Sequence, residues 1–355
     1  MVRRGDPQRE GGGVMTGRFL AAFCLIACLA APAAMAAAVE TEEFTISSRL
    51  PNVELYIRNK HPHTLSEVPT GKTVLFLHGA SYPAHSSFDL PIDGQSWMDW
   101  LASRGYDVYS LDMAGYGKSG HPPEMKQTAE ANPPVVDTSQ AVEDLTRAVD
   151  FILSRRNIDK LVLVGWSWGA TVAGSYANTN QSRVERLVLY APQWLRDVTP
   201  PGDADLARVP AWRSVDPREA RDIWLKAVPE AKRDAVLPKA VFSTWMAATV
   251  ASDSDPAVPG TVRAPNGVVL DTMRFWASGK PRWNPERLSI PALVIQGEWD
   301  AEAPPSMGMV VFNKLTHSPF KRYVMVGETT HAALFETNRV QLYRAVQEFL
   351  EEPVR

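Results

Sequence analysis

Short, uninterrupted apolar runs recur along the chain, and amphipathic patterns of helical period separate several of them. The run at 73–77 reads TVLFL between Gly71 and Gly79, which is typical of a strand buried on both faces. Residues 95–104 and 139–155 place apolar side chains three to four positions apart, as a helix with one buried face does. Comparable apolar runs lie at 107–111, 161–164, 187–190, 292–295 and 322–326. Buried strands that alternate with helices predict a mostly parallel, doubly wound α/β sheet.

Two stretches depart from this alternation. Residues 41–59 alternate apolar and polar side chains, which predicts two antiparallel strands at an edge of the sheet. Residues 193–290 contain no buried-strand run, yet they hold several tryptophans and helical patches such as 217–228. A structureless loop of that length is out of place in a compact domain. We therefore predict a core formed by residues 39–192 and 291–355, interrupted by an inserted, mainly helical subdomain.

An apolar segment near the N-terminus predicts export. The stretch at 19–29 is strongly apolar, and an alanine-rich stretch follows, with A-x-A cleavage motifs at 34–36 and 36–38. This is the pattern of a secretory signal peptide, so we expect residues 1–38 to be removed and the protein to be secreted or periplasmic. The strongly apolar part is shorter than the roughly 20 residues that a membrane span needs. No integral span is therefore expected after cleavage.

Two points about this segment stay open. Cys28 ends a sequence that resembles a bacterial lipobox, so lipid anchoring at Cys28 is an alternative to cleavage after Ala38, although apolar residues follow the cysteine. Translation starts at either Met1 or Met15, because Met15 to Arg18 already forms a compact basic n-region. Neither point changes the expectation of export.

Composition excludes several other classes of function. Cys24 and Cys28 are the only cysteines, and both fall in the predicted signal peptide, which excludes a thiol nucleophile or a thiolate metal site in the mature protein. The formal net charge is −3 and charged residues make up 22%, so no excess of either sign points to a nucleic-acid partner. We expect neither a metal nor an organic cofactor, and the oligomeric state stays open.

The apolar run at 161–164 leads directly into the sequence GWSWG at 165–169, and a helix-like stretch follows. G-x-S-x-G between a strand and a helix is the pattern of a nucleophile elbow, in which the serine occupies a sharp, strained turn. The flanking glycines are needed because larger side chains would strike the neighbouring strand and helix. The N-terminus of the following helix adds a positive dipole where negative charge develops. Ser167 is therefore the predicted nucleophile.

A serine nucleophile needs a base and an acid that orients the base, and in this class of elbow both follow the serine. The run at 292–295 leads to Asp300, and the run at 322–326 leads to His331. The carboxyl ends of parallel strands meet at the edge where open α/β sheets bind ligands. We predict His331 as the base and Asp300 as the acid, with Glu298 as the nearest competitor of Asp300. The less favoured carboxylates, in the insertion and after an earlier strand, are Asp271 and Asp112.

Two backbone N–H groups are expected to form an oxyanion hole. One belongs to Trp168, next to the nucleophile, and the other to Ala80, in the loop after the first buried strand. Gly79 lets the backbone of this loop approach the substrate closely, while His78 is predicted to support the loop by hydrogen bonds rather than to catalyse. Gly79 and Trp166 are candidates for lining the substrate pocket, since an aromatic wall suits an apolar acyl or alcohol group.

These features together resemble the α/β-hydrolase family, which includes esterases, lipases, prolyl iminopeptidases, cofactor-free haloperoxidases, epoxide hydrolases and carbon–carbon bond hydrolases. The resemblance covers residues 41–349. It implies that the insertion at 193–290 is a lid over the active site. The features that carry it are His78-Gly79, the D-x-x-G-x-G-x-S turn at 112–119, the elbow at 165–169, the stretch at 297–300, and His331 followed by Glu336.

Departures from individual branches of the family narrow the expected chemistry. Ser167 stands where epoxide hydrolases and haloalkane dehalogenases need an aspartate that forms an alkyl-enzyme ester. The loop at 78–82 reads HGASY instead of the H-G-G-P-G of prolyl iminopeptidases, although Trp168 is reminiscent of that branch. The chain also lacks the H-G-G-G loop of another esterase branch.

The sequence thus predicts an exported serine hydrolase that cleaves carboxylic esters, or amides, through an acyl-enzyme. The expected substrate is a small molecule with an apolar portion, and its identity stays open. We expect activity to fall below roughly pH 6, as His331 becomes protonated. Alternatives are a cofactor-free haloperoxidase or perhydrolase, a carbon–carbon bond hydrolase, an aminopeptidase-like hydrolase on the same three residues, and a binding protein on a hydrolase fold.

Overall fold

The computed structural model describes residues 38–65, 69–252 and 258–354, which all fall within one unit of mutual contacts, Ala36–Arg355. The predicted signal peptide, with its lipobox cysteine and its alternative start, lies outside these ranges apart from Ala38. Among the helices in the described ranges, none combines the length and the apolarity that crossing a membrane requires.

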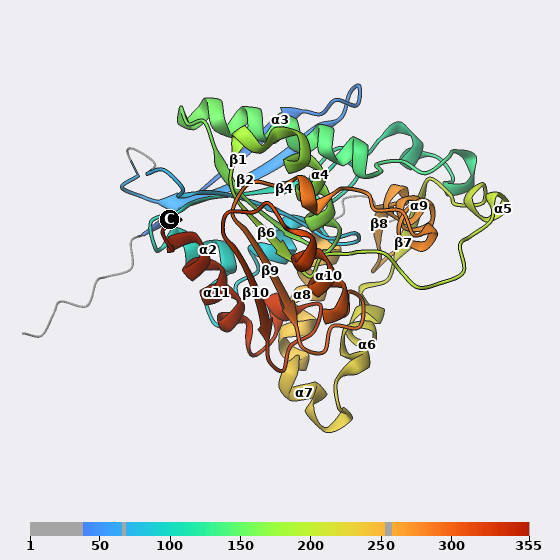
Figure 1. Ribbon diagram of the computed structural model, residues 1–355. Coiled ribbons are helices and arrows are strands. Elements are labelled where there is room, and N and C mark those ends of the chain that lie inside the picture. Colours follow the sequence, from blue (N-terminus) through green and yellow to red (C-terminus); the bar gives the residue numbers. More distant parts are fainter. Residues whose placement is uncertain (1–37, 66–68, 253–257, 355) are drawn as a thin grey trace, which may run out of the picture. The chain divides into compact units, whose positions relative to one another are not determined.

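A sheet lies at the centre of the fold (Figure 1). It has eight strands in the order β1-β2-β4-β3-β5-β6-β9-β10. β1 pairs antiparallel with β2, and β2 with β4, whereas all other neighbours in the sheet are parallel. This confirms the predicted mostly parallel α/β sheet with an antiparallel edge. The strands are β1 Val39–Ser47, β2 Glu54–Pro62, β3 Thr73–Leu77, β4 Asp107–Asp112, β5 Leu161–Trp166, β6 Val184–Tyr190, β9 Ala292–Gly297 and β10 Lys321–Val326.

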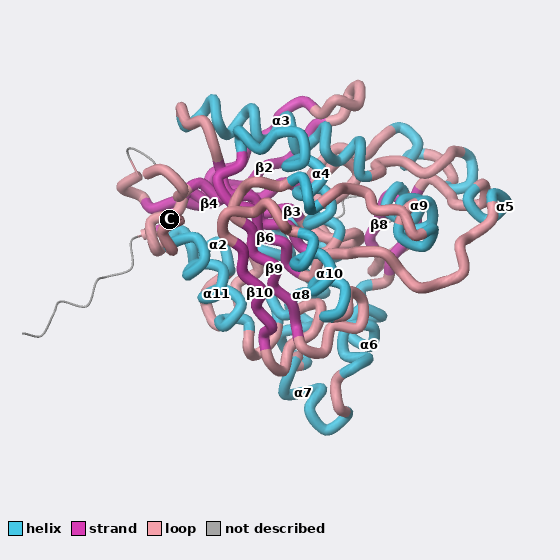
Figure 2. The backbone as a smooth tube through the Cα atoms, viewed as in Figure 1, coloured by secondary structure: helices cyan, strands magenta, loops and turns pink. Residues whose placement is uncertain are grey.

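Helices cover both faces of this sheet (Figure 2). Leu75 and Leu163 belong to a core shared with α3, α4 and α10, whereas Val74 and Val162 belong to a second core shared with α1, α2 and α11. Successive strand residues point to opposite faces, so two covered faces require unbroken apolar runs. The helices are α1 Ala84–Phe88, α2 Trp97–Ala102, α3 Thr138–Arg156, α4 Trp168–Asn180, α10 Pro305–Lys314 and α11 Arg339–Glu351.

The insertion at residues 193–290 consists mainly of short elements around one longer helix, α8. Its two strands pair antiparallel, with Trp212 opposite Pro265. The sequence predicted helices and no strand here, because strands of this length are too short to display a period of two. The segment 217–228, predicted to be helical, is divided into α6 and flanking 3₁₀ turns. The elements are α5 Asp203–Leu206, β7 Trp212–Val215, α6 Ala220–Trp224, α7 Arg233–Val236, α8 Lys239–Ser252, β8 Val262–Pro265 and α9 Gly267–Arg274.

Aromatic packing holds the insertion together and against the core. Trp224 and Trp245 contact each other and Phe335, which follows β10 in the core. The buried tryptophans of the insertion are Trp194, Trp224, Trp245, Trp276 and Trp283. Most of these side chains therefore serve packing.

Candidate active site

Ser167 lies between β5 and α4 in a strained backbone conformation. Its φ is 57° and its ψ is −118°, a region that a residue with a Cβ adopts only when the surroundings hold it there. Ser167 occupies the N-cap position of α4, yet its side chain accepts no hydrogen bond from the helix. The turn therefore presents the hydroxyl beyond the end of the strand instead of using it as a helix cap.

The glycines around Ser167 are required by close backbone approach. A Cβ on Gly165 would lie 2.3 Å from the carbonyl oxygen of Gly169, and a Cβ on Gly169 would lie 2.3 Å from that of Leu77. A Cβ on Gly79 would come within 3.3 Å of the Ser167 Cβ. Any larger residue at 165 or 169 would push β3, β5 and α4 apart, so the pattern G-x-S-x-G has a packing cause here.

Asp300 and His331 are joined at the carboxyl ends of β9 and β10. The Asp300 Oδ2 lies 2.8 Å from the His331 Nδ1, and both side chains are buried. The other carboxylate oxygen, Oδ1, accepts hydrogen bonds from the backbone N–H groups of Glu302 at 2.9 Å and Ala303 at 2.8 Å. Three hydrogen bonds thus hold this buried carboxylate in place, and one of them orients the imidazole.

The competing carboxylates lie elsewhere. Glu298 is exposed, and its Oε2 accepts from the backbone N–H of Glu328. Asp271, in α9, accepts from the backbone N–H of Thr138 at 2.7 Å and so supports the start of α3. Of the carboxylates weighed from the sequence, Asp300 is the one that the fold places against His331.

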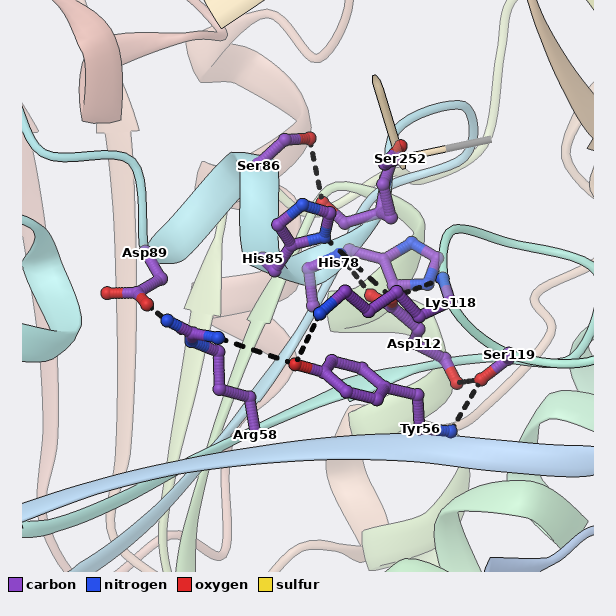
Figure 3. Close-up of polar contacts among 12 residues, drawn as sticks. Tyr56, Arg58, His78, His85, Ser86, Asp89, Asp112, Lys118, Ser119 and Ser252 are labelled. Atoms are coloured by element: carbon purple, nitrogen blue, oxygen red, sulfur yellow. Dashed lines mark hydrogen bonds and ion pairs between the residues drawn. The ribbon is translucent and has the colours of Figure 1, made fainter. Parts of the chain in front are cut away.

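Asp112 stabilises the turn that follows β4. Its Oδ1 accepts from the backbone N–H of Ala84 at 2.7 Å, and its Oδ2 accepts from that of Lys118 at 3.0 Å. The Ser119 hydroxyl donates to the Asp112 carbonyl and accepts from the backbone N–H of Tyr56, which ties the turn to β2 (Figure 3). The carboxylate is thereby engaged by backbone N–H groups and holds the turn.

The loop that carries His331 is held by several donors. The carbonyl oxygen of His331 accepts from the Trp166 indole at 2.9 Å and from the Tyr190 hydroxyl at 2.8 Å. Next to it, the buried carboxyl of Glu336 accepts from both the backbone N–H and the hydroxyl of Thr330. Because these partners come from β5, β6 and the segment after β10, the imidazole is fixed relative to the elbow.

The electrostatic surroundings favour the protonated form of His331. Burial by itself lowers the pKa of an imidazole, but the charges of Asp300 and Glu302 and the hydrogen bond to Asp300 outweigh it, and they raise the pKa of His331 to about 9. Such a site stabilises the imidazolium that a general base becomes once it has taken a proton. The expectation that activity falls below roughly pH 6 assumed a histidine with an ordinary pKa. In this environment the fall in activity is expected at a higher pH.

His78 supports the loop after β3 through both ring nitrogens. Its Nε2 accepts from the backbone N–H of Met113 at 3.1 Å, so its Nδ1 carries the proton and donates to the Gly79 carbonyl at 2.7 Å. Burial lowers the pKa of His78 despite the nearby charge of Asp112, which keeps this neutral tautomer. Both ring nitrogens are therefore engaged in holding the loop.

The predicted oxyanion loop is also held from outside the core. The carbonyl oxygen of Ala80 accepts from the Tyr116 hydroxyl at 2.9 Å and from the Arg213 guanidinium at 3.0 Å. The second predicted donor, the backbone N–H of Trp168, lies in the first turn of α4. The Trp168 indole donates to the Thr138 hydroxyl and packs in the core, so this side chain does not wall the pocket.

A cavity of about 50 Å³ lies at Ser167. A larger cleft of about 400 Å³ shares four of its lining residues, which are Ser81, Tyr82, Trp224 and Glu302. The cavity is lined by Gly79, Ala80, Ser81, Tyr82, Trp166, Ser167, Trp224, Glu302 and His331. The fold thus brings the predicted Ser167, His331, Gly79, Ala80 and Trp166 to one cavity, and the insertion contributes Trp224.

Several residues at this cavity and at the adjoining cleft were not predicted from the sequence. Glu302 follows Asp300 by two positions, so the same argument about strand ends would have found it. Tyr82 lies two residues beyond Ala80 in the loop after β3, so the argument that placed Ala80 at the site would have found Tyr82 as well. Arg213 had no detectable signal, because its partners at 80 and 81 are far from it in sequence and its own strand is short.

Comparison with known families matches residues 70–338 to the family described as serine aminopeptidase, S33. Epoxide hydrolase 3 of Siraitia grosvenorii is 29% identical to the chain over 137 residues, which make up 37% of this chain and 35% of that protein. The match therefore spans about a third of the length of this relative.

Solved structures share the fold at lower identity. An esterase from Thermogutta terrifontis aligns with a TM-score of 0.54 and 17% identity, over 87% of this chain and 98% of that one. The 2-hydroxy-6-oxo-6-phenylhexa-2,4-dienoate hydrolase of Rhodococcus sp. strain RHA1 aligns with a TM-score of 0.56 and 18% identity, over 89% of this chain and 100% of that one. With this sheet, this elbow and a family match over most of its length, the chain belongs to the α/β-hydrolases, in the family described as serine aminopeptidase, S33.

Proposed function

We propose that the protein is an exported serine hydrolase that cleaves carboxylic esters, with amides as the alternative substrates, through an acyl-enzyme. One observation carries this proposal: a serine in a strained elbow lines the same cavity as a buried histidine, and that histidine is hydrogen-bonded to a buried aspartate. Export is supported by the apolar segment at 19–29 and the cleavage motifs that follow it.

The proposed reaction proceeds in two halves. His331 accepts the proton of the Ser167 hydroxyl through Nε2 while the serine oxygen attacks the ester carbonyl, and Asp300 holds the proton on Nδ1. The backbone N–H groups of Ala80 and Trp168 donate to the oxyanion of the tetrahedral intermediate. His331 then gives its proton to the leaving alcohol. A water molecule, activated by the same imidazole, releases the acid from the serine.

The lining of the site supports a neutral substrate with an apolar part. Trp166 and Trp224 give the cavity aromatic walls, which suit an acyl or alcohol chain. The outer cleft carries the carboxylates of Asp216, Glu219 and Glu302 against the guanidinium of Arg213, so acidic side chains outnumber basic ones in its lining. These charges repel an anion such as a dienoate. Ester cleavage is therefore favoured over the carbon–carbon bond alternative.

A panel of matched esters tests this proposal. We expect purified protein to hydrolyse p-nitrophenyl butyrate, and to hydrolyse the p-nitrophenyl monoester of glutaric acid at least about tenfold more slowly in kcat/KM, because the second acyl chain ends in a carboxylate. Glu219→Gln should reduce the difference in kcat/KM between the two esters. Equal rates on both esters would contradict the charge argument. Absence of ester hydrolysis together with bromination that depends on peroxide and a short carboxylic acid would favour the perhydrolase alternative.

The pH dependence follows from the state of His331. Only the neutral imidazole accepts the serine proton, and its pKa is raised, so kcat/KM should fall as pH falls through that pKa. The acid limb is therefore expected well above pH 6.5. Glu302→Gln removes one of the charges that raise this pKa and should move the limb to lower pH. A profile measured with p-nitrophenyl butyrate that stays flat down to pH 6 would contradict the role of His331.

A further inference from the structure

Arg213 connects the insertion to the loop that carries the proposed oxyanion donor. It lies in β7, and its Nη2 donates to the Ala80 carbonyl at 3.0 Å and to the Ser81 hydroxyl at 2.9 Å. Its Nη1 donates to the Pro265 carbonyl at 2.8 Å and to the Asn266 side-chain oxygen at 2.9 Å. One planar guanidinium thus joins the end of β8, in the insertion, to the loop after β3, in the core.

Arg213 donates to neutral oxygens although carboxylates line the same cleft. The cleft of about 400 Å³ that Arg213 lines also contains the carboxylates of Asp216, Glu219 and Glu302. Within the described ranges, none of the ion pairs involves Arg213, while Asp216 pairs with Arg218. The guanidinium is instead directed at neutral oxygens of the loop and of β8. Arg213 therefore holds the backbone of these segments in place and, among the described residues, does not neutralise a carboxylate.

The geometry of Ala80 explains why such a contact matters for an oxyanion hole. Its N–H is the proposed donor to the oxyanion, and its carbonyl is held by Tyr116 from the core and by Arg213 from the insertion. A fixed carbonyl limits rotation about the backbone of Ala80, and so limits the directions in which its N–H can point. A donor that is aimed before the reaction costs no reorganisation in the transition state.

We propose that Arg213 is a positioning residue that holds the oxyanion loop in its reactive conformation and makes that conformation depend on the insertion. The inference rests on the proposed function and adds a residue from β7 to it. Loss of the guanidinium leaves Ser167, His331 and Asp300 in place, and it loosens only the aim of one oxyanion donor. The effect should therefore fall on the transition state and not on substrate binding.

Arg213→Lys and Arg213→Ala test this role. The lysine ammonium keeps the charge but cannot span both pairs of acceptors. With p-nitrophenyl butyrate we expect kcat to fall about 10- to 100-fold in both variants, with KM within about threefold of the wild type. Added guanidinium ion should restore part of the kcat of Arg213→Ala. Arg218→Ala, an exposed arginine of the same insertion, serves as the matched control and should keep the wild-type kcat.

Inhibitor binding separates positioning from a general structural defect. A trifluoromethyl ketone forms an oxyanion on Ser167, whereas the matching secondary alcohol fills the same space without one. Arg213→Lys should weaken the ketone about 10- to 100-fold and leave the affinity of the alcohol unchanged. Tyr116→Phe removes the other donor to the Ala80 carbonyl, and the losses from Tyr116→Phe and Arg213→Lys should not be additive, because both act through one oxygen.

Two kinds of result overturn the proposal in distinguishable ways. If the wild type hydrolyses the ester and Arg213→Lys keeps its kcat, or loses ketone and alcohol affinity in parallel, then Arg213 does not position the loop and the proposed function stands. If the wild type neither hydrolyses the ester nor binds the ketone, then the proposed function fails and this inference fails with it.

Discussion

Ser167→Ala is expected to lower kcat for p-nitrophenyl butyrate by about 10⁴- to 10⁶-fold, to a rate close to that of the uncatalysed reaction. The hydroxyl is the only group at the elbow that can form the acyl-enzyme, and the remaining cavity can at most bind and polarise the ester. The glycines around the elbow permit its strained backbone, because a Cβ added at either position would clash with neighbouring backbone. Alanine is no larger than serine, so it fits the same conformation. The variant should therefore fold normally.

A fluorophosphonate probe provides the control for this experiment. The probe should label the wild type at Ser167 and leave Ser167→Ala unlabelled, whereas Ser289→Ala, which alters an exposed serine outside the lining of the cavity, should remain labelled. Thermal unfolding of the variants should match that of the wild type. Hydrolysis by Ser167→Ala at the wild-type rate would end the assignment of the nucleophile. A wild type that the probe does not label would favour the binding-protein alternative.

Asp300→Asn is expected to lower kcat by about 10³- to 10⁴-fold with little change in KM. The asparagine amide can donate to Nδ1 of His331, which places the ring proton on Nε2, where the nitrogen can no longer accept the proton of Ser167. Substitution also removes the charge that stabilises the imidazolium. The backbone hydrogen bonds from Glu302 and Ala303 can be accepted by the remaining amide oxygen, so the turn after β9 is preserved.

Glu298→Gln is the matched control, because Glu298 lies two residues before Asp300 but is exposed and bonded to the backbone of Glu328. Steady-state kinetics of the two variants should differ by about three orders of magnitude. A severe loss in Glu298→Gln with a mild one in Asp300→Asn would transfer the role of the acid to Glu298 and require the turn after β9 to rearrange.

Periodicity predicted the sheet because burial acts residue by residue. Each of the runs at 73–77, 161–164 and 292–295 is apolar without interruption, since helices cover both faces of the strands that these runs form. The same reasoning failed in the insertion. β7 and β8 have four residues each, so their pairing depends on partners about fifty residues apart in sequence and not on a local pattern.

The amino-acid sequence alone determined the central sheet, the elbow at Ser167 and the order in which the proposed nucleophile, acid and base occur, because these depend on local spacing, on glycine and on the ends of successive strands. The tertiary structure decided which carboxylate meets His331, how far its pKa is raised, and which side chains of the insertion reach the cavity. Those outcomes depend on contacts between segments that are distant in the chain, and on the burial of charges, neither of which a local pattern records. Arg213 shows the difference most clearly, since its position at the loop exists only once β7, β8 and the core are packed together.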